Sequence, residues 1–154
     1  MGKVLEIYIA ERSGVPMQSI EQAQLEAGKG IVGDRYYSGQ GTFSERLAGL
    51  PDVELTLIES EEVDAFNREQ GFDFSCGDFR RNIVTQGVRL NELEGCEFTL
   101  GGIRLRGVRL CEPCAHLAGI LTDAIMPALV HKTGLRAEII SSGNVQLGDT
   151  LTTV

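Results

Sequence analysis

The chain has 154 residues, a length that predicts one domain with its own hydrophobic core. Hydrophobic residues make up 42% of it and charged residues 23%, which is typical of a globular protein and excludes a disordered one. Its 14 Lys and Arg residues against 22 Asp and Glu residues give a net charge of −8. Nucleic acids and anionic membrane surfaces are bound through cationic side chains, so this balance argues against both as partners.

The sequence predicts a cytoplasmic protein with reduced thiols. No apolar run approaches the roughly 18 residues that a membrane span needs. The first ten residues include Glu6 and lack a cationic segment ahead of an apolar run, so they do not resemble a signal peptide. The cysteines are therefore expected to be free thiols rather than a disulfide framework. They are Cys76, Cys96, Cys111 and Cys114.

Basic residues are concentrated in one central segment. Residues 1–78 carry a net charge of −9 and residues 111–154 a net charge of −2. Residues 79–110 carry a net charge of +3, and all six of their basic residues are arginines. Arginine is suited to bidentate binding of phosphate or carboxylate. Two of these arginines, Arg104 and Arg106, flank Leu105 and fit outward positions of a strand equally well.

Strand patterns predominate along the chain. Residues 3–10 and 52–58 are short, partly alternating runs rich in apolar side chains. Residues 97–100 and 103–110 are predicted to form a hairpin, because Gly101-Gly102 between them tolerates positive φ. Further strands are expected at residues 135–140, 144–147 and 150–154. The regular spacing of these strands is typical of a barrel or a sandwich.

Two helices are expected. The first runs from residue 61 to about residue 70, with Ser60 as its N-cap and Gly71 as its end. The second covers residues 115–131 and is broken or kinked near Pro127. The predicted architecture is thus one mainly β domain with one or two helices.

Residues 28–50 are predicted to form a long loop, since they contain six glycines and little periodicity. The loop includes a match to the G-x-G-x-x-G dinucleotide motif at Gly28, Gly30 and Gly33. We expect no NAD site there, because the preceding residues do not look like a buried strand and the following ones do not open a helix. The glycines fit better in a tight loop that presents Asp34 and Arg35.

The C-x-x-C motif from Cys111 to Cys114 is the sharpest local feature. It follows a predicted strand and precedes a helix, with Pro113 suited to the first helical position. A helix start favours a thiolate at Cys114, whereas the negative charge of Glu112 disfavours it. The motif is also compatible with a pair of cysteines that merely pack and with a thioredoxin-type dithiol.

A zinc site is not expected, because Cys76 and Cys96 are twenty residues apart and supply no second paired motif. The two histidines, His116 and His131, form no recognisable catalytic array and are interpreted as helix-surface or satisfied core residues.

Four sequence elements occur together in an order that resembles the MOSC domain family, named after the C-terminal part of the molybdenum cofactor sulfurases. They are Gly33-Asp-Arg-Tyr, Arg80-Arg-Asn-Ile-Val-Thr-Gln-Gly, Cys111-Glu-Pro-Cys, and the closing pair Gly134-Leu-Arg-Ala and Gly143-Asn-Val-Gln-Leu-Gly-Asp. The resemblance extends from about residue 28 to the C-terminus. It implies that residues 1–154 are a single MOSC domain with a mainly β fold, a closed β-barrel of the pyruvate-kinase barrel type.

The resemblance also implies a ligand, the molybdenum cofactor (Mo-molybdopterin), and a reactive cysteine. The second cysteine of the motif, Cys114, matches the family's reactive residue, which is proposed either to carry a persulfide sulfur or to ligate molybdenum. Arg80, Arg81 and Asn82 match the family's cofactor-binding R-x-N element. Arg35 and Cys111 are weaker candidates for the same site.

The leading hypothesis is therefore a molybdenum cofactor binding and sulfur-carrier protein. Its sulfur donor would be a pyridoxal-phosphate cysteine desulfurase, and whether the chain is itself a sulfurtransferase is left open. One alternative is the molybdenum-dependent reductase component for N-hydroxylated substrates, which needs an electron-transfer partner. The other is a non-enzymatic interaction module in which Cys111 and Cys114 are structural. A homodimer that completes the pocket is also left open.

Overall fold

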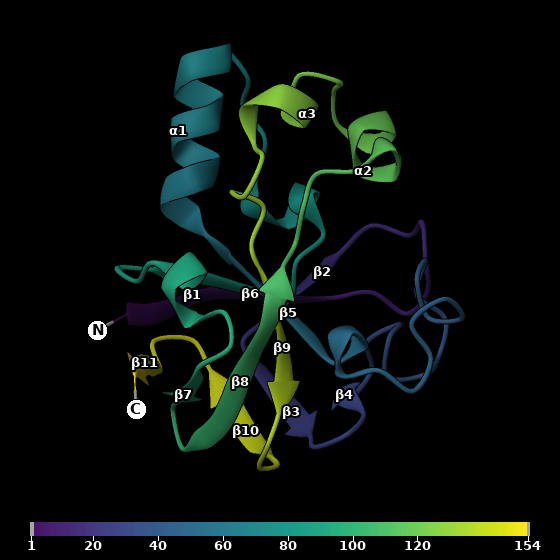
Figure 1. The fold of residues 1–154 in the computed structure, drawn as a ribbon, viewed down its shortest axis with the longest axis vertical. Helices are drawn as coiled ribbons and strands as arrows, with labels where there is room; N and C mark the ends of the chain where they lie inside the picture. The colour runs from purple at the N-terminus through teal and green to yellow at the C-terminus, as the bar shows by residue number, and fades with distance from the viewer. Residues whose placement is uncertain (1, 154) are drawn as a thin grey trace.

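The computed structural model describes residues 2–153, which form a barrel with a group of helices at one end (Figure 1). The strands are β1 (Gly2–Ile9), β2 (Gln18–Ile20), β3 (Gln22–Glu26), β4 (Gly30–Ile31), β5 (Leu55–Glu59), β6 (Ile83–Gln86), β7 (Glu97–Leu100), β8 (Ile103–Leu110), β9 (Leu135–Ile139), β10 (Gly143–Gln146) and β11 (Thr150–Thr153). The helices are α1 (Ser60–Gln70), α2 (Ala115–Ile120) and α3 (Ile125–Ala128), with short 3-10 helices at Pro51–Val53, Cys76–Phe79 and Leu90–Leu93.

Seven strands close into a mixed barrel in the order β11-β7-β8-β9-β5-β6-β1, and β1 pairs with β11 to complete the ring. Strand β2 adds to β1 outside the ring, and β10, β3 and β4 form a small second sheet. Within the ring β5 and β6 are parallel and the other pairs antiparallel. The predicted mainly β barrel with few helices is confirmed.

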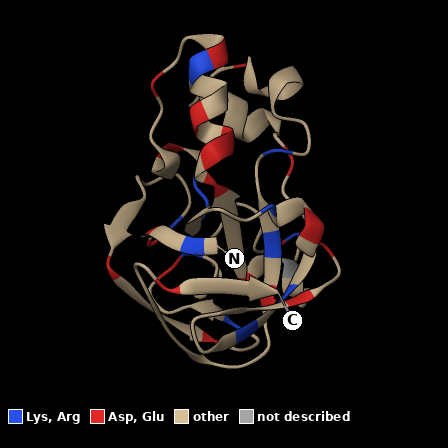
Figure 2. Ribbon diagram, turned by 90° about the vertical axis from the view of Figure 1, so that its left-hand side faces the viewer, with Lys and Arg blue, Asp and Glu red and all other residues tan. Residues whose placement is uncertain are grey.

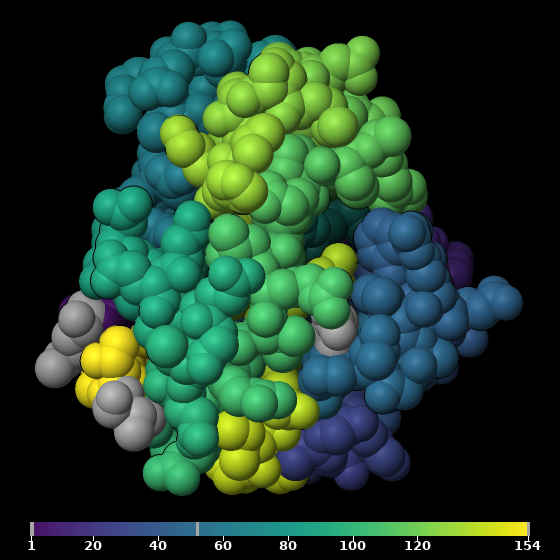
Figure 3. All heavy atoms as spheres, in the orientation of Figure 1, coloured from purple at the N-terminus to yellow at the C-terminus, as the bar shows by residue number. Residues whose placement is uncertain are grey.

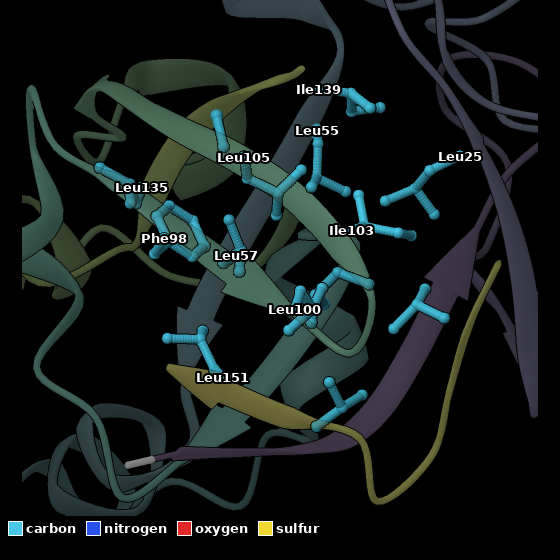
Figure 4. Packing of buried hydrophobic residues seen from close by; sticks show 14 of the residues in the cluster. Leu25, Leu55, Leu57, Phe98, Leu100, Ile103, Leu105, Leu135, Ile139 and Leu151 are labelled. Carbon is cyan, nitrogen blue, oxygen red and sulfur yellow. The ribbon is translucent and has the colours of Figure 1, made fainter. Parts of the chain in front are cut away.

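The side chains on one face of each barrel strand fill the barrel interior. Leucine, isoleucine and phenylalanine side chains from β5, β7, β8, β9 and β11 point into the same space (Figure 4). Phe98 and Leu105 are register partners on β7 and β8, and both are completely buried. Burial of such side chains stabilises the fold by roughly 1.5–3 kcal/mol each.

The hairpin of β7 and β8 is the element that the sequence predicts best. Leu100 pairs with Ile103 across the Gly101-Gly102 loop. Arg104 and Arg106 are exposed on either side of the buried Leu105, as expected for outward strand positions. Their charges pair with neighbouring strands, Arg104 with Glu97 at 3.6 Å and Arg106 with Glu138 at 2.7 Å.

Strand β3 corrects one premise of the sequence analysis. The residues before the Gly28 motif do form a strand, in which Ala23 and Leu25 are buried and the residues between them exposed. Its polar composition does not indicate a strand. It is a strand because it pairs with β10, which lies far along the sequence. The residues after Gly33 form turns rather than a helix, and the long segment 28–50 contains β4 as its only regular element among the described residues.

A second hydrophobic cluster lies between the helices and the outer face of β5 and β6. Ile58 and Val84 on those strands pack with Val63 and Phe66 of α1. Helix α1 ends at Gly71, as predicted, in the left-handed conformation. Ser60 is not the N-cap, because the helix already includes it and Glu59 precedes it. The exposed side of α1 carries acidic residues (Figure 2).

The second expected helix is two short helices, α2 and α3. The break falls at residues 121–124 rather than at Pro127. There the Thr122 hydroxyl accepts a hydrogen bond from the Ala124 N–H at 3.3 Å, a local bond that competes with helix continuation. Pro127 sits in the first turn of α3, where its missing N–H costs nothing. His131 lies beyond both helices, so the prediction of a helix position for it is wrong.

Gly134 is required for the close packing of β9 on β5. Its φ is +108°, and a Cβ atom there would overlap the carbonyl oxygen of Leu57. Its own carbonyl accepts a hydrogen bond from the Cys111 N–H at 2.8 Å, which fixes the chain just before the C-x-x-C motif turns away from β8.

We predict that Gly134→Ala lowers the free energy of unfolding by at least about 2–3 kcal/mol, through backbone strain and the clash with Leu57. Gly119→Ala is the matched control, since Gly119 is exposed in α2 with open space around its Cα. It should leave stability unchanged or raise it by up to about 1 kcal/mol. Urea unfolding measures both, and equal effects of the two substitutions would contradict the requirement for glycine at position 134.

Candidate functional site

Cys114 opens into a cavity lined largely by arginines, here called the cysteine cavity. Its volume is about 310 Å³. Its lining residues are Phe43, Arg46, Leu47, Arg81, Arg109, Leu110, Glu112, Cys114 and Arg136. In Figure 3 the blue loop around residues 43–47 lies beside the green segment around residue 110, and the surface is hollowed between them. Four of the described lining residues are basic and one is acidic, in a chain whose net charge is −8.

The barrel positions two of the arginines directly. Arg109 on β8 and Arg136 on β9 are register partners, so their backbones are held side by side. Both side chains line the cysteine cavity, so two neighbouring strands of the barrel each contribute one guanidinium group to it. The guanidinium of Arg136 also lies 5.7 Å from the ring centre of Phe43, which links the long loop to the barrel.

Arg81 is held by the backbone on the protein side of the cavity. Its Nε donates to the Thr133 carbonyl at 2.8 Å and its Nη1 to the Phe79 carbonyl at 3.3 Å. Two carbonyl partners fix the plane of the guanidinium without cancelling its charge. Arg46 lies in the long loop and is exposed, so its side chain is the most adaptable of the cationic groups.

Cys114 is the N-cap residue of α2 and is partly buried. Its side chain makes no capping hydrogen bond. The expectation that Pro113 is the first helical residue is wrong, because α2 begins at Ala115 and Pro113 precedes the cap. Helix α2 has only six residues, so the arginines are the larger source of positive charge around the cavity.

The other predicted arginines lie at a different cavity, here called the Arg80 cavity. It has a volume of about 520 Å³ and shares no described lining residue with the cysteine cavity. Arg80 adopts φ +61°, and its Nη1 donates to the Val15 carbonyl at 2.5 Å. Its Nη2 is buried and has no hydrogen-bond partner among the described residues. Burial, together with the charge of Arg35, lowers the pKa of the Arg80 guanidinium.

Arg35 does not line that cavity but contacts the backbone of Arg80, which does. It is 5% exposed, pairs with Asp34 at 3.0 Å and donates to the Arg80 carbonyl at 3.1 Å. The structure therefore places Arg35 with Arg80, and Arg81 with Cys114. The two consecutive arginines thus line separate cavities, and Arg80 is in the left-handed conformation.

Asn82 and Cys111 are buried outside both cavities. The Asn82 side chain accepts hydrogen bonds from the Thr56 N–H and hydroxyl, both at 3.1 Å, and donates to the Tyr8 carbonyl at 3.0 Å. Asn82 thus joins β1, the start of β5 and the start of β6. Cys111 is 2% exposed, and its carbonyl accepts from the Thr133 hydroxyl at 2.6 Å. Direct contact of these two residues with a cofactor remains a prediction.

The four thiols have distinct environments. Cys96 is exposed, Cys111 buried, and Cys76 and Cys114 partly buried. Burial, followed by the charge of Glu6, raises the pKa of the Cys76 thiol to about 12. Cys76 is therefore protonated, and unreactive as a nucleophile, at neutral pH.

Sequence reasoning does not single out Arg46, Arg109 and Arg136 as site residues. Arg109 belongs to the central arginine segment and Arg136 to the closing family element, so a signal exists for both. Arg46 lies in the long loop with no pattern around it. Among the side chains that the structure describes, no three or more of His, Cys, Asp and Glu are grouped so that they could hold a metal ion. No helix in the part of the chain that the structure describes is long and apolar enough to cross a membrane.

Comparison with known proteins decides the family. The sequence pattern of the MOSC domain matches residues 44–152, more than two thirds of the chain. The chain belongs to the MOSC domain family. This confirms the resemblance drawn from the Arg80 and Cys111 elements. No curated protein sequence matches the chain.

Solved structures agree with the MOSC assignment at the level of the fold. YuaD from Bacillus subtilis superposes with a TM-score of 0.82 at 17% identity, over 98% of this chain and 94% of that one. YiiM from Geobacillus stearothermophilus gives 0.74 at 15% identity, over 100% and 75% of the two chains. YiiM from Escherichia coli gives 0.70 at 19% identity, over 100% and 70%.

We predict that a neutral alkylating reagent labels native Cys96 and Cys114 and spares Cys76 and Cys111. The reasons are the exposure of Cys96, the opening of the partly buried Cys114 into the cysteine cavity, the raised pKa of Cys76 and the burial of Cys111. Labelling of Cys76 should increase only as the pH approaches about 12, provided that the fold persists. Peptide mass spectrometry after a short pulse measures each site. Rapid labelling of Cys76 at neutral pH would contradict the assignment.

Proposed function

We propose that this MOSC protein is a sulfur carrier that binds the molybdenum cofactor and accepts persulfide sulfur on Cys114. The observation that carries the proposal is the juxtaposition of a partly accessible thiol with four arginine side chains in one cavity. Cysteine supplies the sulfur nucleophile, and arginine is the side chain best suited to an anionic, phosphate-bearing ligand.

The residues present fit molybdopterin. Arg46, Arg81, Arg109 and Arg136 line the cysteine cavity and would hold its phosphate. Arg80 lies at the other cavity, so direct contact of its guanidinium with the same cofactor stays a prediction. When bound, the cofactor supplies a molybdenum centre with dithiolene sulfur ligands, to which a sulfur atom can be delivered. The protein's part is to bind, orient and present the carrier sulfur.

Sulfur acceptance by Cys114 requires no external oxidant. The Cys114 thiolate attacks the outer sulfur of a donor persulfide, such as that of a pyridoxal-phosphate cysteine desulfurase. A new S–S bond forms at Cys114, the donor's S–S bond breaks, and its electron pair leaves with the donor thiolate. An acceptor thiolate then attacks the outer sulfur in the same way and restores the Cys114 thiolate. The arginines of the cavity balance the negative charge of the persulfide.

We expect the wild-type protein to gain one labelled sulfur atom from a cysteine desulfurase and Cys114→Ala to gain none. Cys96→Ala is the matched control, because Cys96 is the more exposed thiol and lies outside the cysteine cavity. It should behave like the wild type. Intact-protein mass spectrometry with and without reductant detects the persulfide. Unchanged sulfur acceptance by Cys114→Ala would disprove the carrier role.

Cofactor binding is tested by the molybdenum and pterin content of protein purified from a host that makes the cofactor. Arg46→Gln should weaken binding about fivefold, the loss expected for one exposed charge contact. Arg68→Gln changes the net charge equally on the exposed face of α1 and should have no effect. Loss of molybdenum in Cys114→Ala with pterin retained would favour the reductase component, in which Cys114 ligates the metal. Absence of both from the wild type would leave sulfur carriage without stable cofactor binding.

A further inference from the structure

Glu112 is an acidic side chain in an arginine-lined cavity, and so competes with any anionic ligand. It lines the cysteine cavity together with Arg46, Arg81, Arg109 and Arg136, and it is the one acidic group among the described lining residues. A carboxylate that lines the same cavity as four guanidinium groups can pair with one of them when no other group holds it. The partner of Glu112 therefore affects how available the arginines are.

That partner is His131. The His131 backbone N–H donates to Glu112 Oε1 at 2.6 Å, and Nδ1 lies 2.5 Å from Oε2. A carboxylate only accepts hydrogen bonds, so Nδ1 carries the proton in this contact. Both carboxylate oxygens are thus engaged by one residue, which orients the group towards the rim of the cavity.

The backbone at His131 is itself fixed in the conformation that this contact needs. Its φ is +61°, unusual for a residue other than glycine, and this conformation turns the N–H towards Glu112. Its carbonyl accepts a hydrogen bond from Asn91 Nδ2 at 2.8 Å, which ties the turn to the 3-10 helix at Leu90–Leu93. The two side chains remain accessible, His131 at 68% and Glu112 at 42%, so their interaction is modest in strength and open to exchange.

We propose that His131 is a positioning residue that holds Glu112 away from the arginines and so sets the anion affinity of the cysteine cavity. The inference rests on the arginine site of the proposed function and adds a determinant of its ligand preference. Without the imidazole contact, only the backbone N–H of residue 131 still holds Glu112, so the carboxylate turns more readily to a neighbouring guanidinium and must then be displaced before a phosphate group can bind. Glu112 then also limits which ligands compete, since weakly charged ones cannot displace it.

The test is a four-member cycle of wild type, His131→Asn, Glu112→Gln and the double variant, titrated with inorganic phosphate by calorimetry at fixed pH and ionic strength. Asparagine is the chosen replacement because it tolerates φ near +60° and is too short to reproduce the Nδ1 contact. Thermal unfolding of each variant verifies that the fold is retained. We expect His131→Asn to weaken phosphate binding roughly threefold to fivefold, in keeping with the loss of one partly exposed polar contact.

Rescue is the decisive result. Glu112→Gln should bind phosphate at least as tightly as the wild type, and adding His131→Asn to it should have no further effect, because no carboxylate remains to compete. An equal loss in both backgrounds would assign His131 a merely structural role and overturn the inference, as would an unchanged affinity in His131→Asn. Absence of phosphate binding by the wild type would overturn it together with the arginine site. The persulfide assay on Cys114 tests the proposed sulfur carriage independently of this phosphate titration.

Discussion

The antiparallel pairing of β8 with β9 is the constraint on which the candidate site depends. It places Arg109 opposite Arg136 and brings Leu110 beside Leu135, at the end of the barrel where the chain leaves β8 towards Cys114. Gly134 makes this geometry possible, since it allows the backbone to approach Leu57 and offers its carbonyl to Cys111. Cys114 is therefore carried by a short segment that is anchored to the barrel through the Cys111 N–H.

The other side of the cysteine cavity has a different character. Phe43, Arg46 and Leu47 come from the long segment between β4 and β5, which has few regular hydrogen bonds of its own. Glu54, at the end of that segment, joins it to the turn before β4 and to β9, because its buried carboxylate accepts from the Gly28 N–H at 3.2 Å and the Ile139 N–H at 3.0 Å. Burial raises the pKa of Glu54, opposed by these two hydrogen bonds. One side of the cavity is thus formed by barrel strands and the other by a loop, and binding residues are often carried by loops on a scaffold of strands.

The sequence predicts those parts of the fold whose signal is local. The β7–β8 hairpin follows from alternation around two glycines, and the end of α1 follows from Gly71. Strand β3 escapes such prediction because its residues are polar and its pairing partner, β10, is more than a hundred residues away. The break between α2 and α3 does not fall where the proline predicts it, because a threonine hydroxyl interrupts the helix first.

In the candidate site, too, some features have a local sequence signal and others depend on the folded structure. Cys114 and Arg81 can be chosen from the motif and the family resemblance, and the fold brings them to one cavity. The sequence does not assign Arg80 and Arg81 to separate cavities, because the family element groups the two arginines as one cofactor-binding unit. The partnership of Glu112 with His131 joins residues nineteen positions apart through a turn that sequence patterns assign to a helix.

The closure of the barrel by β1 and β11 has a consequence for how the molecule assembles. Gly2 pairs with Leu151, so the ring is completed by strands from opposite ends of the described chain. During synthesis the strands that bear the cysteine cavity emerge before β11, and they remain in an open, incompletely paired sheet until the last strand arrives. Such long-range closure slows folding and leaves strand edges exposed in the meantime. The nascent protein therefore passes through a stage in which β1 and β7 lack their common partner strand.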